Sequence, residues 1–132
     1  MPKIKLLLEY PEANIYSFIS DRGEDIVYSF IDNNLQETEQ KKIIKLIGLF
    51  HQYGNIENKE AFKYLQYGVF EFKRGQVRIL CYFLTGRKVK SLVLLHGFKK
   101  KCQRTHKQEL EKAVSRKNLI EKLLMYFELE II

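Results

Sequence analysis

The sequence predicts a small α+β domain, and three observations lead to this fold class. Two β-type segments open the chain, two helical segments follow, and a run of three strands precedes a last helix. Strands and helices grouped in this way are typical of α+β domains with a layer of helices on one face of an antiparallel sheet. The 132 residues, of which 45% are hydrophobic, suffice for one domain with its own core.

The first half of the chain predicts two strands and two helices. The four segments are residues 4–10, 15–19, 24–32 and 34–53. The first two are short and apolar, as strands are, whereas the other two repeat apolar side chains at helical spacing. Asp21 and Asn34 each stand three residues before a Glu, which is the spacing of a capping box and marks the expected helix starts. We expect Gly54 to end the second helix.

The second half predicts a three-stranded antiparallel meander and then a helix. The strands are residues 69–73, 76–84 and 89–96, separated by two tight turns. In the middle strand, alternation places Ile79 and Cys81 on the core face, and Arg78 and Tyr82 on the other face. A basic loop follows the third strand, and we expect Thr105 to begin the last helix.

Basic side chains are concentrated in one stretch of the chain. The formal net charge is +7, but residues 73–108 carry eleven Lys and Arg and no Asp or Glu. Residues 1–40 carry three basic and eight acidic side chains. Because a solvated surface normally mixes both signs, this stretch predicts a field that attracts a polyanion, either nucleic acid or an acidic protein segment. The alternative is a soluble face that is simply basic.

Several functional classes find no support in the sequence. No apolar run approaches the roughly 20 residues of a membrane helix, and no secretory signal is visible, so we expect a cytoplasmic protein. Cys81 and Cys102 make a poor disulfide framework and are expected to be reduced thiols. Three scattered histidines, without CxxC or HxxxH spacing, indicate neither a metal site nor another cofactor.

A series of short motifs resembles the phage-derived branch of the RelE/HigB toxin superfamily. In chain order the matching residues are Gly68–Lys73, Val77–Phe83, Leu94–Phe98, Lys100–Lys101, Thr105, Ala113 and Arg116. Each motif is common, but their ordered succession is specific. Lys73 stands where the family has Arg, and His106 where it has Pro. Residues 1–12 look like an extension of the domain, and residues 119–132 form an apolar tail.

The resemblance implies both a fold and an activity. The fold is RelE-like, with two N-terminal helices on one sheet face and a C-terminal helix, all within residues 1–132. The activity is that of a type II toxin, a metal-independent endoribonuclease that cuts mRNA in the ribosome. The implied partners are mRNA, the ribosome and a cognate antitoxin of the helix-turn-helix type. Two alternatives stay open: a ParE-like toxin that binds DNA gyrase without catalysis, and an inactive relative that only binds its antitoxin.

Four residues are expected to carry the chemistry of RNA cleavage. The reaction needs a base for the 2′-hydroxyl, positive charge at the phosphate and a proton for the leaving 5′-oxygen. By resemblance, Arg78 on its strand and the pair Lys100–Lys101 in the following loop converge on one scissile phosphate. A lysine among other cations gives up its proton more readily and can act as base. His106 adjoins the same loop, and histidine exchanges protons near neutral pH.

Four further residues are expected to bind RNA without taking part in the chemistry. Lys73, Lys99 and Arg104 would extend the track of phosphate contacts. Tyr82 shares a face with Arg78 and would stack on a base, although tyrosines in strands usually pack in the core. His96 is expected to pack or to bind backbone.

Overall fold

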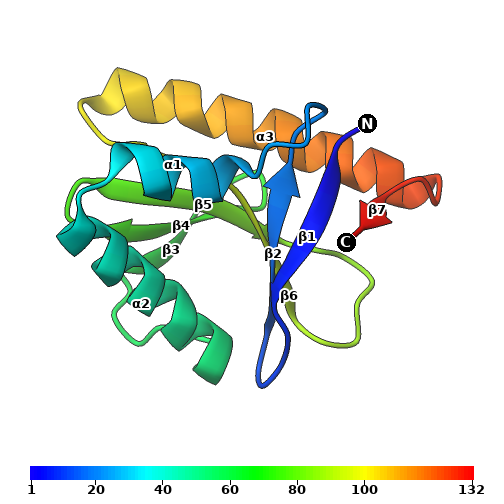
Figure 1. Ribbon diagram of the computed structural model, residues 1–132, viewed down its shortest axis with the longest axis horizontal. Coiled ribbons are helices and arrows are strands. Elements are labelled where there is room, and N and C mark those ends of the chain that lie inside the picture. Colours follow the sequence, from blue (N-terminus) through cyan, green and yellow to red (C-terminus); the bar gives the residue numbers. More distant parts are fainter.

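The computed structural model describes residues 1–132 as one seven-stranded sheet with three helices (Figure 1). The elements are β1 (Lys3–Leu8), β2 (Asn14–Ile19), α1 (Ile26–Asn34), α2 (Glu37–Tyr53), β3 (Phe62–Gln66), β4 (Val69–Arg74), β5 (Val77–Phe83), β6 (Ser91–Lys99), α3 (Gln103–Met125) and β7 (Glu130–Ile131). The α+β class and the meander β4–β5–β6 are therefore confirmed.

The order of strands across the sheet is β3-β4-β5-β6-β2-β1-β7. Neighbours are antiparallel except for β2 with β6 and β1 with β7, which are parallel. The chain leaves β2 through α1 and α2 and rejoins the sheet at its far edge, in β3. The strand reversals from β3 to β6 then bring β6 alongside β2 in the same direction. The sheet is thus mixed, whereas the sequence predicts an antiparallel sheet.

Helices cover both faces of the sheet, so the expected single layer of helices is wrong. Helices α1 and α2 lie on one face and α3 on the other (Figure 1). Both sides of β5 are consequently buried, with Ile79 and Cys81 towards α1 and α2 and with Leu80 and Tyr82 towards α3. Since α1 and α2 already fill the first face, the apolar stripe of α3 can be buried only on the second.

The first two helices begin later than the sequence spacing predicts. Asp25 caps α1, where its carboxylate accepts a hydrogen bond of 3.0 Å from the backbone N–H of Tyr28. Helix α2 has a capping box formed by Gln36 and Glu39, in which Glu39 accepts from the Gln36 backbone at 2.9 Å. The predicted end of α2 is confirmed, because Gly54 adopts a left-handed conformation with φ of 72°.

Strand β6 contains a bulge that determines which side chains face each helix layer. One extra residue, Leu95, stands between two successive partners on β5. Beyond the bulge His96 and Phe98 point towards α3. Gly97 lies against α1 on the other face, where a Cβ atom would be 2.4 Å from a ring carbon of Phe30. A side chain at this position would therefore displace α1.

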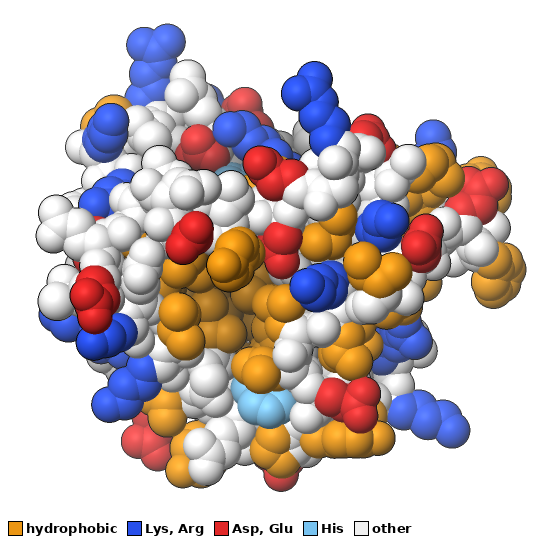
Figure 2. All heavy atoms as spheres, viewed as in Figure 1, with side chains coloured by type: hydrophobic (Ala, Val, Ile, Leu, Met, Phe, Trp, Pro, Cys, Tyr) orange, Lys and Arg blue, Asp and Glu red, His pale blue; other side chains and the backbone are white.

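Both ends of the chain join the sheet. Residues 3–8, part of the expected extension, form β1, which pairs with β2 and with β7. The apolar tail continues α3 to Met125; Ile120 and Leu123 are buried, whereas Tyr126 and Phe127 are exposed. None of the helices is both long and apolar enough to span a membrane. On the face shown in Figure 2, apolar side chains line a hollow of about 460 Å³ between α1, α2 and the first two strands.

Candidate functional site

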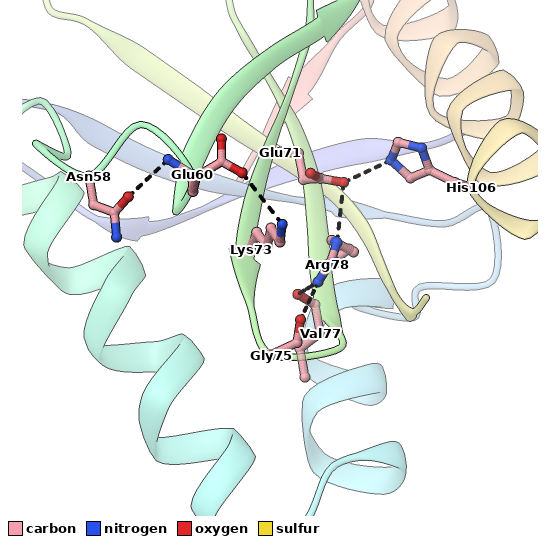
Figure 3. A network of polar contacts seen from close by, with 8 residues as sticks. All are labelled: Asn58, Glu60, Glu71, Lys73, Gly75, Val77, Arg78 and His106. Carbon is pink, nitrogen blue, oxygen red and sulfur yellow. Dashed lines mark hydrogen bonds and ion pairs between the residues drawn. The ribbon is translucent and has the colours of Figure 1, made fainter. Parts of the chain in front are cut away.

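A buried carboxylate on the α3 side of the sheet connects a histidine and an arginine (Figure 3). Glu71 of β4 is 1% exposed. Its Oε1 lies 2.8 Å from Nε2 of His106 on α3 and 3.7 Å from Nε of Arg78 on β5. A carboxylate so far from water needs such partners, because an unpaired buried charge is costly. Three elements therefore converge on Glu71.

The register of the β4–β5 hairpin explains why these groups meet. Lys73 is paired with Arg78 across the hairpin, and Glu71 is the next residue of β4 on the same face. The first turns of α3 lie over this face and bring the His106 ring within 5.9 Å of the Phe98 ring, measured between centroids. The His106 side chain keeps 21% of its surface exposed. The histidine is thus the member of the cluster that solvent reaches most easily.

Arg78 is buried and held in place by its own hairpin. Nη1 donates hydrogen bonds to the carbonyls of Gly75, at 2.6 Å, and Val77, at 3.0 Å. Nε faces Glu71, as given above, whereas Nη2 makes no hydrogen bond within the protein. A guanidinium has five N–H donors, so Nη2 keeps hydrogen-bonding capacity that the protein itself does not use.

A basic concavity of about 530 Å³ opens beside His106. Its lining includes the cations Lys63 and Lys107 and the amides Gln66 and Gln103. Lys63 is paired with Glu71 in the β3–β4 register and so faces the same side of the sheet. Lys73 is close by but lies 3.7 Å from Glu60, which partly balances its charge (Figure 3). This concavity suits an anion that approaches the histidine from solvent.

The lysines after β6 do not share a concavity with Arg78, contrary to our expectation. Lys99 and Lys101 line a different hollow, of about 520 Å³, on the α1 side of the sheet. Lys99 is paired there with Glu39 at 2.9 Å. Hydrogen bonding by the Gln36 backbone, followed by Lys99, keeps the pKa of Glu39 below its usual value. Lys100 lies in the same loop, and its backbone N–H donates to Gln76 at 2.8 Å.

The remaining predicted site residues divide into buried and exposed groups. Tyr82 is 1% exposed beneath α3, and its hydroxyl has no partner. Burial raises the pKa of Tyr82 well above its usual value. A base cannot stack on a ring that is covered on both faces, so the expected RNA contact does not fit this structure. Arg104, in contrast, is exposed in the first turn of α3.

A second histidine and carboxylate pair lies one turn further along α3. Nε2 of His96 is 2.9 Å from Oε2 of Glu109, although neither ring nitrogen makes a hydrogen bond of good geometry. Burial, followed by the positive charges of Arg116 and Lys112, lowers the pKa of His96 to about 3. His96 is therefore neutral at physiological pH and packs as the sequence predicts.

Neither cysteine forms a disulfide. Cys81 is buried, and burial raises the pKa of its thiol. Cys102 is exposed before the first turn of α3, and a hydrogen bond with Thr105 lowers the pKa of its thiol. Nowhere in the chain do three His, Cys, Asp or Glu side chains gather in a way that could hold a metal ion.

Glu71 is the site residue that sequence reasoning missed, although two signals for it are present. It stands between Phe70 and Phe72 in the apolar first part of its strand, and a charge in such a position needs a specific partner. The hairpin turn after Arg74 also fixes the cross-strand register, which places Glu71 beside Arg78. The run of basic residues from 73 to 108 points instead to cations alone.

Fold and site together define a small RelE-like α+β domain with a charged cluster on its α3 face. The family model described as phage-derived protein Gp49-like (DUF891) matches residues 32–118. The chain therefore belongs to this family, which is part of the RelE/HigB-like toxin–antitoxin group. Glu71, Arg78 and His106 all lie within the matched residues. No curated protein matches the chain.

Proposed function

We propose that this protein is the toxin of a toxin–antitoxin pair and acts as a metal-independent endoribonuclease. Its proposed substrate is mRNA on the ribosome, in the cytoplasm, and its proposed inhibitor is a cognate antitoxin of the helix-turn-helix type. The observation that carries the proposal is Glu71, a buried carboxylate shared by His106 and Arg78 at the edge of a basic concavity. Family membership supports the toxin role, and this cluster supports the chemistry.

The cluster has the parts that RNA cleavage by an internal 2′-hydroxyl needs. A carboxylate only accepts hydrogen bonds, so the His106 Nε2 that faces Glu71 carries the hydrogen and Nδ1 keeps its lone pair. Nδ1 can then accept the proton of the 2′-hydroxyl as that oxygen attacks phosphorus. Glu71 holds the ring orientation and stabilises the imidazolium that forms, as carboxylates beside catalytic histidines do.

Charge stabilisation and the second proton transfer come from the cations around the cluster. The free Nη2 edge of Arg78 binds the phosphate oxygens as negative charge develops on them. The ammonium of Lys63 or Lys107, both of which line the concavity with His106, donates a proton to the leaving 5′-oxygen. Lys73, Lys99, Lys100, Lys101 and Arg104 extend the positive field towards the rest of the RNA.

Cleavage in a cell-free translation system tests the proposal. The wild-type protein should shorten translated mRNA, with ends that primer extension maps, and should leave untranslated mRNA intact. His106→Ala, Glu71→Gln and Arg78→Lys should each slow cleavage by about a hundredfold or more. His51→Gln is the matched histidine control, because His51 binds the carbonyl of Ala13 outside the cluster. It should cleave like wild type.

Three results would contradict the proposal. Translated mRNA that stays intact with the wild-type protein would exclude the activity. DNA breaks that depend on gyrase, with intact mRNA, would support the non-catalytic toxin instead. If folded His106→Ala cleaves mRNA at an unchanged rate, the protein is a nuclease but the proposed site is not its active site.

A further inference from the structure

The hairpin that joins β3 to β4 presents aromatic rings to solvent next to the proposed site. Tyr67 is 67% exposed at the tip of the hairpin, and Tyr64 is also exposed. The turn consists of Tyr67 and Gly68, with φ of 55° and 82°. Glycine tolerates such values, but a bulky aromatic residue rarely adopts them, and backbone strain of this kind tends to gather at functional sites. A large ring stands at a position where only glycine would be free of strain.

A groove leads from His106 to this tyrosine. The concavity beside His106 adjoins a second one, of about 280 Å³, which Tyr67 lines together with Glu111 and Val114 of α3. The two share three lining residues, Gln66, Lys107 and Leu110. They therefore form one continuous groove between the β3–β4 hairpin and α3, with His106 at one end and Tyr67 at the other.

The two ends of this groove differ in their chemistry. The His106 end carries the cations Lys63 and Lys107, which suit a phosphate. The Tyr67 end carries an exposed ring and the carboxylate of Glu111, which repels phosphate but accepts hydrogen bonds from the amino groups of bases. A phosphate bound at the first end would place a neighbouring base towards the second end.

We infer that the β3–β4 hairpin is a subsite for single-stranded RNA, in which Tyr67 stacks on a base next to the cleaved phosphate. This inference rests on the proposed function and adds the position of the substrate chain. Aromatic stacking combined with nearby cations is the general way in which proteins hold single-stranded nucleic acid. Because the stack forms equally in the ground state and the transition state, Tyr67 contributes to substrate affinity and not to the chemical step.

Binding is measured with variants in a His106→Ala background, where RNA stays intact. Fluorescence anisotropy follows a labelled single-stranded oligoribonucleotide at a fixed salt concentration. Tyr67→Ala should weaken binding by roughly 5- to 150-fold, the range that corresponds to one lost stack. Tyr67→Phe should bind like the parent, since it keeps the ring. Tyr53→Ala is the matched control, because Tyr53 is similarly exposed but lies at the end of α2 and lines neither part of the groove.

Tyr67→Gly separates binding from folding. Glycine suits the positive φ of this turn, so the variant should melt no lower than the parent while it loses the same affinity as Tyr67→Ala. In the active protein, Tyr67→Ala should raise KM for cleavage and leave kcat unchanged.

The outcomes distinguish failure of the inference from failure of the proposed function. If Tyr67→Ala binds RNA like its parent, the subsite is excluded even where the wild-type protein cleaves. A loss in Tyr67→Phe as large as that in Tyr67→Ala would also exclude stacking, because the hydroxyl would then be responsible. If the wild-type protein never cleaves but binding still depends on the Tyr67 ring, the RNA subsite is supported and only the nuclease is lost.

Discussion

The two faces of the sheet are built from different kinds of side chain. The core beneath α1 and α2 is apolar and rich in aromatic rings, with neighbouring centroids as close as 4.8 Å. The core beneath α3 is also apolar at its centre but buries a carboxylate, a guanidinium and an imidazole, those of Glu71, Arg78 and His96. Burial of apolar surface stabilises the fold, whereas burial of charge costs free energy unless partners offset it.

This difference indicates a division of labour between the two faces. The α1–α2 face supplies stability through close packing of apolar and aromatic side chains. The α3 face accepts a less favourable interior, which is what a site for binding charged groups requires. Substitutions on the α1–α2 face should therefore lower the free energy of unfolding, whereas substitutions on the α3 face should lower the rate of RNA cleavage.

Removal of one apolar side chain should have its largest effect on stability on the α1–α2 face. Phe50 of α2 is fully buried and packs against rings from three strands, namely Phe62, Phe72 and Phe83. Phe50→Ala should lower the free energy of unfolding by about 3–5 kcal/mol, as measured by urea denaturation. RNA cleavage per folded molecule should stay unchanged. The exposed Ile44→Ala on the same helix is the control and should cost less than about 0.5 kcal/mol.

On the α3 face a substitution should remove activity without removing stability. The double variant Glu71→Leu with Arg78→Met replaces the buried ion pair with apolar side chains. Such replacements are often neutral or stabilising, by up to about 4 kcal/mol, so urea denaturation should show no loss, while RNA cleavage disappears. Glu71→Leu alone leaves Arg78 unpaired and should destabilise by about 3–5 kcal/mol. A double variant less stable than this single variant would refute the expected coupling between the two residues.

The smallest expected effect is on the pH dependence of stability, which should come from His96 on the α3 face. The folded protein holds the pKa of His96 at about 3, below its ordinary value of 6.5, so folding favours the neutral ring. His96 therefore has no effect on the pH dependence of stability above pH 6.5. As the pH falls from 6.5 towards 3, the unfolded chain binds a proton that the folded protein does not, and stability drops by up to about 1.4 kcal/mol per pH unit.

The variant His96→Gln should flatten this acid dependence in urea denaturation series between pH 4 and pH 7. His51→Gln, at the end of α2 on the other face, should keep the slope of the wild-type protein. Equal slopes in all three proteins would show that His96 is protonated in the folded state, for which Glu109 is the nearest carboxylate.

Local features of the fold could be predicted from the sequence, whereas the pairing of distant segments could not. The alternation of β5 and the left-handed Gly54 depend on neighbouring residues, and both are as predicted. Strand β3 was missed, because residues 62–66 are a short edge segment with charged and polar positions. The parallel pairing of β2 with β6 depends on the whole intervening chain, and no local pattern reports it.

The same limit explains what the sequence revealed of the candidate site. Arg78 and His106 were singled out by charge and by position in a motif, and the structure brings both to one carboxylate. The expected convergence of Lys101 on Arg78 assumed that the loop after β6 folds towards α3. The bulge in β6 determines on which side of the sheet Lys101 lies, and no sequence pattern predicts this bulge.

The bulge at Leu95 reverses the alternation of side chains in the rest of β6. Every residue after it, from His96 to Lys99, changes sides relative to an uninterrupted strand. Without the bulge, a regular strand of the same sequence would turn Gly97 towards α3 and Phe98 into the space held by Phe30, and the lysines that follow would exchange sides. A single backbone irregularity therefore couples the packing of α1 to the distribution of positive charge at the end of the sheet.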